Sequence, residues 1–223
     1  MQTAAEEASA LTQDCALMVG LTGGIACGKS HATRAFGELG AHIIDADAIA
    51  HELIHSQSPA YREIVDTFGS GILTEVEEID RKRLGAIIFR DEAARQKLNA
   101  ILHPKIIEEE ARRSAEIQSQ YGSCIIIVDA ALMIEAGYYR RFDKLIVVHC
   151  RPELQIHRLM CRDGLDHEAA QARIASQMPV VQKLKLADYI IETSGTYRLT
   201  RSKIVTIHGL LIRDLLAKGM PSP

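Results

Sequence analysis

Short, almost continuous apolar segments alternate along this chain with longer segments of helical periodicity. The apolar segments are rich in Val and Ile and cover residues 17–22, 42–45, 124–129, 144–149 and 188–192. Because they do not alternate with polar residues, they are typical of strands buried on both faces of a parallel sheet. Helical periodicity covers residues 30–39, 92–102, 104–121, 153–161, 167–178 and 199–217. Strands and helices in this order predict a doubly wound α/β core.

Two long excursions interrupt the alternation. Residues 46–123 separate the second and third predicted strands, which is far more chain than one crossover helix needs. This length predicts an inserted, mainly helical lobe. Residues 152–187 are rich in Arg, Lys and Gln and predict a mobile lid. The expected parts are a polar N-terminal extension (1–16), an α/β core (17–55, 122–151 and 188–223), a helical lobe (56–121) and a lid (152–187).

The composition excludes several classes of protein. The 223 residues are 47% hydrophobic and 25% charged, which is typical of a folded globular chain. A net charge of -3 provides no general positive field, so we expect neither long nucleic acid nor a membrane surface as a partner. The five cysteines have no C-x-x-C spacing, and residues 1–16 lack Lys and Arg. We therefore predict a reducing, cytoplasmic location without an export signal or membrane anchor.

The strongest chemical signal directly follows the first predicted strand. Residues 23–30 read GGIACGKS, the G-x-x-x-x-G-K-S phosphate-loop pattern, with an apolar strand before it and a helix after it. Glycines let the main-chain N–H groups turn toward phosphates, and the following helix adds its positive end. Lys29 is expected to reach the β and γ phosphates, and the Ser30 hydroxyl to bind Mg²⁺. The nucleotide-binding residues predicted here are Gly23, Gly24, Ile25, Ala26, Cys27, Gly28, Lys29, Ser30 and His31.

The sequence lacks two motifs that are typical of proteins that hydrolyse GTP or ATP. A switch-type GTPase needs an N-K-x-D element, and the only Asn of the chain is Asn99, within KLNAI. Hydrolysing ATPases commonly end the third strand with Asp-Glu, but here Asp129 is followed by Ala130. The carboxylate expected beside Mg²⁺ is present without a water-activating Glu. Phosphoryl transfer from ATP to a bound acceptor therefore fits the sequence better than hydrolysis.

Two carboxylates, Asp45 and Asp47, follow the second predicted strand in the run IIDAD. The carboxyl ends of strands form the ligand-binding edge of an open α/β sheet. Phosphoryl transfer to an alcohol needs a group that orients the hydroxyl and accepts its proton. Two roles are therefore open for this pair, catalytic base and cap of the following helix.

A competing motif lies just beyond this pair. Residues 51–55 read HELIH, which matches the H-E-x-x-H pattern of helical zinc proteases, and Glu75 could supply a third ligand. The other interpretation is that His51 and His55 are solvated or packing histidines. A nucleotide-binding regulator without turnover is a further alternative for the whole chain.

Several blocks, taken in order, resemble the dephospho-CoA kinase family. They are LTGGIACGKS, IIDADAIAHEL, ILHPKI, VDAALMIEAG, RLMCRDGLDHEAAQARIASQMP and ADYIIETSG. The resemblance implies a P-loop NTPase fold with a five-stranded parallel core, a helical lobe that receives dephospho-CoA, and a lid. It implies transfer of the ATP γ-phosphate to the ribose 3′-hydroxyl of dephospho-CoA, and it does not imply an obligate protein partner. The alternative is another small-molecule or nucleoside monophosphate kinase of the same fold.

The resemblance also implies roles for individual residues. The catalytic residues would be Asp47, Lys29 and Arg162; the metal ligands Ser30 and Asp129; the adenine-loop residues Thr193, Ser194 and Gly195; and the substrate-binding residues Thr22, Asp47, His103, Pro104 and Arg158. For the two lid arginines, a solvated helix face is the other interpretation. The chain departs from the family pattern at Ala131, where Pro is usual, and at Thr193, where Asn is common.

Overall fold

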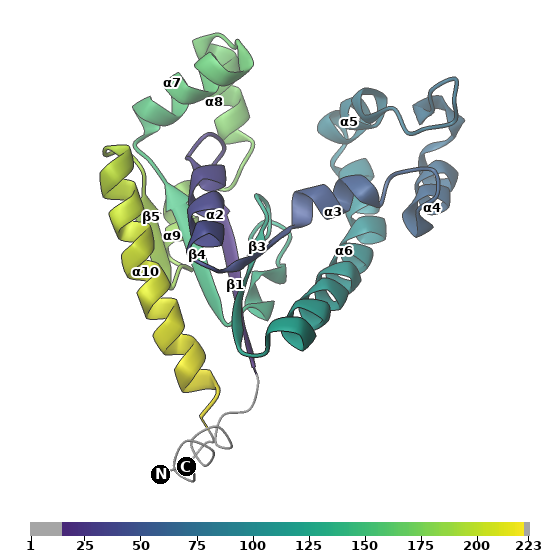
Figure 1. The fold of residues 1–223 in the computed structure, drawn as a ribbon. Helices are drawn as coiled ribbons and strands as arrows, with labels where there is room; N and C mark the ends of the chain where they lie inside the picture. The colour runs from purple at the N-terminus through teal and green to yellow at the C-terminus, as the bar shows by residue number, and fades with distance from the viewer. Residues whose placement is uncertain (1–14, 221–223) are drawn as a thin grey trace, which may run out of the picture. The chain divides into compact units, whose positions relative to one another are not determined.

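The computed structural model describes residues 15–220 and has a five-stranded sheet at its centre, in the order β2-β3-β1-β4-β5 (Figure 1). β1 pairs in parallel with β3 and β4, and β4 pairs in parallel with β5. The strands are β1 (Ala16–Gly23), β2 (His42–Asp45), β3 (Cys124–Asp129), β4 (Lys144–His149) and β5 (Tyr189–Glu192). The predicted α/β fold with a five-stranded parallel core is confirmed.

The strands read as continuous apolar runs because both faces of the sheet are covered. Val19 and Leu21 of β1 are fully buried in the cluster that contains Phe36. Gly20 faces the other side, where an added Cβ would lie 2.7 Å from the Phe142 side chain and 2.8 Å from Met133. Any larger residue here would force the Phe142 and Met133 side chains to shift.

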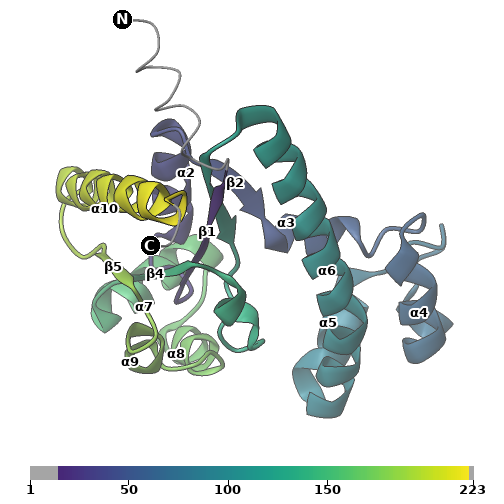
Figure 2. The same ribbon diagram turned by 90° about the horizontal axis from the view of Figure 1, so that it is seen from below.

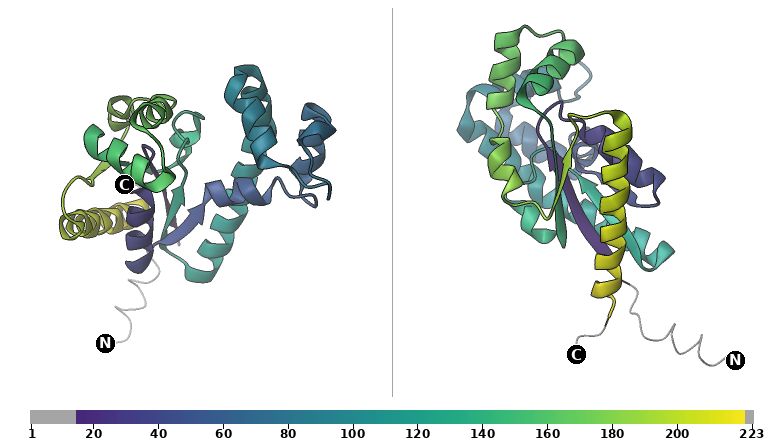
Figure 3. Two further views of the ribbon diagram at one scale, coloured as in Figure 1. Left: turned by 90° about the horizontal axis from the view of Figure 1, so that it is seen from above. Right: turned by 90° about the vertical axis from the view of Figure 1, so that its left-hand side faces the viewer.

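Helices α2 (Lys29–Glu38) and α10 (Tyr197–Lys218) cover one face of the sheet, as Figures 2 and 3 show. Ala32 and Ala35 of α2 and Ile204 of α10 share one buried cluster with β1, β3 and β4. The small alanines bring α2 close to the strands, so the helix that begins after the phosphate loop is firmly placed. The helices of the lid region are α7 (Pro152–Asp163), α8 (His167–Ala175) and α9 (Val180–Leu184).

The described part of the chain divides into two compact units, residues 15–44 with 114–220, and residues 45–113. The smaller unit has its own core, which includes Ile64, Ile72, Leu84 and Leu98. Its boundaries differ from the expected 56–121 partly because Leu53 and Ile54 also pack on this core. The helices of this unit are α3 (Ala46–Glu52), α4 (Pro59–Phe68), the 3₁₀ helix η1 (Ser70–Ile72), α5 (Arg81–Arg90) and the first part of α6 (Glu92–Tyr121).

The expectation of two helices on either side of Pro104 is wrong. A single helix, α6, runs from Glu92 to Tyr121 with Pro104 inside it. A proline removes one helical hydrogen bond, which favours a break. Here Leu98, Leu102 and Ile106 on both sides of the proline pack on the same core, so tertiary packing outweighs the lost bond.

Two expectations concern membranes and the N-terminus. No helix within residues 15–220 combines the length and apolar character needed to span a bilayer. The predicted polar extension lies outside the described residues except for its last two, and Ala16 already belongs to β1.

Candidate active site

The phosphate-loop sequence forms a tight turn between β1 and α2. The Cys27 N–H donates to the Gly24 carbonyl at 3.1 Å, which closes the turn. Gly28 caps α2 with φ 86°, a left-handed conformation that favours glycine. An added Cβ on Gly23 would lie 2.4 Å from the Val148 carbonyl oxygen. Both glycines of the motif are therefore required by backbone geometry.

Two glutamines of the lid region hold the backbone of Ile25 within this loop. The Gln155 side-chain amide donates to the Ile25 carbonyl at 2.8 Å. The Ile25 N–H donates to the Gln177 side-chain oxygen at 2.9 Å. Neither glutamine was predicted from the sequence, because no spacing rule connects a side-chain amide to a loop so far away along the chain. Their contacts support the loop shape from the lid side.

The predicted phosphate-binding lysine and metal carboxylate lie together. Lys29 Nζ forms an ion pair with Asp129, which is 6% exposed at the carboxyl end of β3. The Thr33 hydroxyl donates to the other Asp129 oxygen at 2.6 Å. Thr33 was not predicted, although its position one helical turn after Lys29 places both on one helix face. The carboxylate is thus oriented from two sides by α2.

The oxygen donors near the loop fit Mg²⁺. Ser30 is exposed in the first turn of α2, and Asp129 supplies a carboxylate. Mg²⁺ prefers oxygen and is usually held by one or two protein groups together with phosphates and waters. No group of three or more His, Cys, Asp or Glu residues in the described part of the chain could hold a metal ion. The donor set fits a metal shared with a nucleotide rather than an all-protein cage.

The H-E-x-x-H residues do not form a zinc site. Helix α3 ends at Glu52, so His55 lies beyond it and the two histidines are not one turn apart on a helix. His55 Nδ1 lies 3.7 Å from Glu78. Glu52 forms an ion pair with Arg113. The competing zinc-protease interpretation is therefore wrong.

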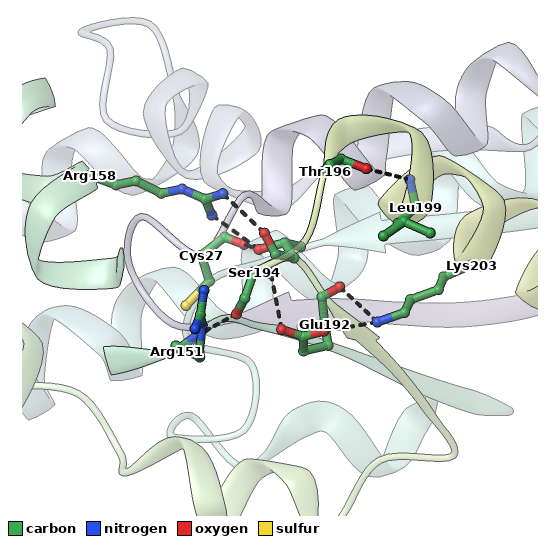
Figure 4. Close-up of polar contacts among 9 residues, drawn as sticks. Cys27, Arg151, Arg158, Glu192, Ser194, Thr196, Leu199 and Lys203 are labelled. Carbon is green, nitrogen blue, oxygen red and sulfur yellow. Dashed lines mark hydrogen bonds and ion pairs between the residues drawn. The ribbon is translucent and has the colours of Figure 1, made fainter. Parts of the chain in front are cut away.

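A chain of hydrogen bonds joins α7, the loop after β5 and the phosphate loop (Figure 4). The Thr193 hydroxyl donates to the Cys27 carbonyl at 2.8 Å. Arg158 donates to the same hydroxyl at 3.1 Å and to the Thr193 carbonyl at 3.0 Å. Thr193, which departs from the family pattern, is therefore buried and supports the phosphate loop.

The rest of the expected adenine loop is fixed by polar contacts (Figure 4). The Arg151 N–H donates to the Ser194 hydroxyl at 2.8 Å, and the Ser194 N–H donates to Glu192 at 3.1 Å. Lys203 forms an ion pair with Glu192 at 2.9 Å. These partners, Ser194 first, lower the pKa of the Glu192 carboxyl to about 2. Gly195 follows as an exposed residue.

His31 packs against an aromatic ring from α10. The ring centroids of His31 and Tyr197 are 4.3 Å apart, and the rings are tilted by 38°. Burial, followed by the charge of Arg34, lowers the pKa of His31. A neutral imidazole is therefore favoured next to the predicted nucleotide site.

Arg162 lies on the same helix as Arg158 but has different partners. It donates two hydrogen bonds to Asp163, at 2.7 and 3.1 Å. Arg173 donates to the same carboxylate at 2.8 Å. The hydrogen bond from Arg162 is the largest cause of the lowered pKa of Asp163. Both arginine side chains are about half exposed, so they lie at the surface of the lid region.

Thr22 is buried, and its hydroxyl donates to the Ala131 carbonyl at 3.0 Å. Lys183 donates to the same carbonyl at 3.3 Å. Its Nζ also forms an ion pair with Glu135 at 2.6 Å, and its side chain is 0% exposed. The loop after β3 is therefore held by β1 and α9. The sequence did not predict that this lysine is buried.

The smaller unit contains the residues predicted as catalytic base and as acceptor-binding residues. Asp45 accepts a hydrogen bond from the Ala48 N–H at 2.9 Å and caps α3. Asp47 lies in the first turn of α3 and is exposed. His103 is half-buried, and burial lowers its pKa. Pro104 beside it is exposed on α6. Of the two carboxylates, Asp45 has the capping role.

Comparisons with known proteins identify the family of this chain. Residues 17–198 match the model of the dephospho-CoA kinase family. The dephospho-CoA kinase of Carboxydothermus hydrogenoformans is 44% identical over 190 residues, which cover 85% of this chain and 92% of that protein.

Solved structures give the same result. The dephospho-CoA kinase from Campylobacter jejuni has a TM-score of 0.66 at 32% identity, with 88% of this chain and 98% of that chain covered. A shikimate kinase from Acinetobacter baumannii, at 16% identity and a TM-score of 0.50 with 90% and 96% covered, shares the fold alone. The resemblance seen in the sequence is confirmed, and this chain belongs to the dephospho-CoA kinase family.

Proposed function

We propose that this protein transfers the γ-phosphate of ATP to the ribose 3′-hydroxyl of dephospho-CoA and releases coenzyme A and ADP. The observation that carries the proposal is a complete phosphate loop, with Lys29 paired to Asp129, in a member of this family. We place the enzyme in the cytoplasm, because its five cysteines are all free thiols. The runner-up, another kinase of the same fold, has only a fold-level likeness in its favour.

Nucleotide binding would begin with an exchange of partners at the phosphate loop. Lys29 leaves Asp129 for the phosphates, and Thr33 keeps the carboxylate oriented. Mg²⁺, held by Ser30 and Asp129, would supply positive charge that neutralises the transferred phosphate. The adenine ring would lie near residues 193–195, whose conformation is already fixed by hydrogen bonds.

The acceptor would bind to the smaller unit, with His103 and Pro104 among its contacts. Asp45 is engaged as a helix cap, which supports assigning the base role to Asp47. Its carboxylate would accept the hydroxyl proton as the oxygen attacks phosphorus in line. Because the group is exposed in the first turn of a short helix, it can be reached by a ligand from solvent.

Two lid arginines would have separate tasks. Arg162 is about half exposed and shares Asp163 with Arg173, so it can exchange this carboxylate for phosphate oxygens. Arg158 is bonded to Thr193 and would keep the loop after β5 against the phosphate loop. Arg158, which was predicted to bind the substrate, would then influence the substrate through the loop after β5.

The test is ADP release by the purified protein with Mg²⁺ and ATP across acceptors. Dephospho-CoA should give acceptor-dependent ADP, whereas AMP, CMP, shikimate and gluconate should give only background. Mass spectrometry of the product should identify coenzyme A. Acceptor-independent ADP release, or preference for another acceptor, would contradict the proposal.

A further inference from the structure

Two buried cysteines meet at the phosphate loop. Cys27 lies within the loop, and Cys150 directly follows β4. Their sulfur atoms are 3.6 Å apart and share a hydrogen bond. Cys27 is 1% exposed and Cys150 is 4% exposed. The proposed kinase chemistry uses neither thiol.

The surroundings make the two thiols unequal. The hydrogen bond shared with Cys27, followed by the positive charge of Arg158, lowers the pKa of the Cys150 thiol to about 7. The same pairing, together with burial, raises the pKa of Cys27. Cys150 is therefore the more acidic of the two thiols and the one that more readily becomes a thiolate. A nucleophilic sulfur beside a second sulfur is the arrangement from which a disulfide forms.

We propose that Cys27 and Cys150 are an oxidisable dithiol site, which hydrogen peroxide converts into an intrachain disulfide that weakens ATP binding. The Cys150 sulfur attacks one peroxide oxygen, the O–O bond breaks, and the departing oxygen takes a proton and leaves as water. The Cys27 sulfur then attacks the sulfenic sulfur of Cys150. An S–S bond forms, and the hydroxide that leaves takes the Cys27 proton to give a second water. Two thiols lose two electrons in total, and one peroxide gains them.

The cross-link has a direct mechanical consequence for the loop. An S–S bond is about 2.05 Å long, so the two sulfurs must approach each other by roughly 1.5 Å. The Cys27 backbone is held by Gly24 through its N–H and by Thr193 through its carbonyl. Movement of Cys27 therefore strains the turn that is expected to hold the phosphates. A misplacement of about 1 Å in a group that positions a substrate can lower the reaction rate on the order of 100-fold. For the phosphate loop we expect the affinity for ATP to fall at least tenfold.

The experiment treats the reduced full-length protein with hydrogen peroxide and then removes the oxidant. Two of its five thiols should be lost, and peptide mapping should find the Cys27 and Cys150 peptides joined. The Kd for Mg·ATP, measured by calorimetry without any acceptor, should rise at least tenfold and recover after dithiothreitol. Because no acceptor is present, this readout is separate from the identity of the substrate.

Two variants complete the test. Cys150→Ser should retain its ATP affinity after peroxide treatment. The matched control is Cys161→Ser, which removes an exposed thiol outside the pair and should remain as sensitive as the wild type. The proposal is overturned if no Cys27–Cys150 cross-link forms, if the cross-link leaves the Kd unchanged, or if Cys150→Ser loses affinity as the wild type does.

Discussion

The chemistry of the two carboxylates after β2 depends on their backbone positions. Asp45 has extended backbone angles, φ −90° and ψ 102°, which turn its side chain onto the Ala48 N–H. This is the geometry of a helix N-cap. Asp47 is two residues further on, inside the helix and exposed. Residues of one type in one short run therefore lie in different structural positions.

Asp47→Asn should lower kcat by a factor of about a hundred or more, because an amide cannot accept the hydroxyl proton. The Kd for Mg·ATP should not change. The control is Asp45→Asn, in which asparagine still caps α3 and turnover stays close to that of the wild type. Steady-state kinetics and calorimetry measure both quantities. A lost turnover in Asp45→Asn with a normal Asp47→Asn would transfer the base role to Asp45.

Lys29→Met should lower kcat at least 100-fold, since the variant lacks the lysine ammonium that stabilises the charge developing on the transferred phosphate. The fold should survive, because Asp129 keeps its hydrogen bond from Thr33. Circular dichroism and steady-state kinetics test the two statements. Near-normal turnover in a folded variant would contradict the nucleotide assignment.

At the scale of the element, strands were easier to predict than helices and loops. Burial on both faces gives the central strands a continuous apolar run, as in β3, where all six residues are buried. Helix α6 was predicted in two pieces, because the local effect of Pro104 is visible in a sequence and the packing that overrides it is not. Lys183 was not recognised as buried, since its partner Glu135 lies in another loop.

Lys183→Met should lower the free energy of unfolding by about 3 kcal/mol, because Glu135 is left partly buried without its cation. The double variant Lys183→Met with Glu135→Leu should recover most of this loss, since an apolar pair needs no charge partner. Urea denaturation of the two single variants and the double variant gives the coupling energy. As a control, Lys185→Met removes an exposed lysine and should change little. Additive losses in the double variant would contradict the coupling.

The loop after β5 should show a pH-dependent contribution from Glu192. Its partners lower the pKa of the folded state from 4.5 to about 2, so the carboxylate stabilises the fold above about pH 4.5. This stabilisation is lost as pH falls toward 2. The wild type should therefore exceed Glu192→Gln in unfolding free energy at pH 7, and the difference should shrink below pH 4.5. Urea denaturation at several pH values measures it, and a difference that grows at acid pH would contradict the assignment.

At the scale of the whole molecule, the sequence was sufficient for the order of the parts and for the phosphate loop. Contacts between distant loops were missed, as with Gln155 and Gln177 on Ile25, and with Cys27 beside Cys150. Such contacts depend on how loops meet after the sheet has formed. The periodicity of apolar residues indicates which positions of one helix or strand are buried. It does not indicate which loops contact one another in the folded protein.

The two compact units, each with its own core, should respond to different ligands. Mg·ATP should slow amide hydrogen exchange in residues 23–30 and 193–195, because it orders the phosphate and adenine loops. Dephospho-CoA alone should slow exchange within residues 45–113 and leave the phosphate loop unchanged. Exchange followed by mass spectrometry resolves these segments in the intact protein. If dephospho-CoA protected only the sheet unit, the smaller unit could not be the acceptor lobe, and Asp47 would lose its proposed role with it.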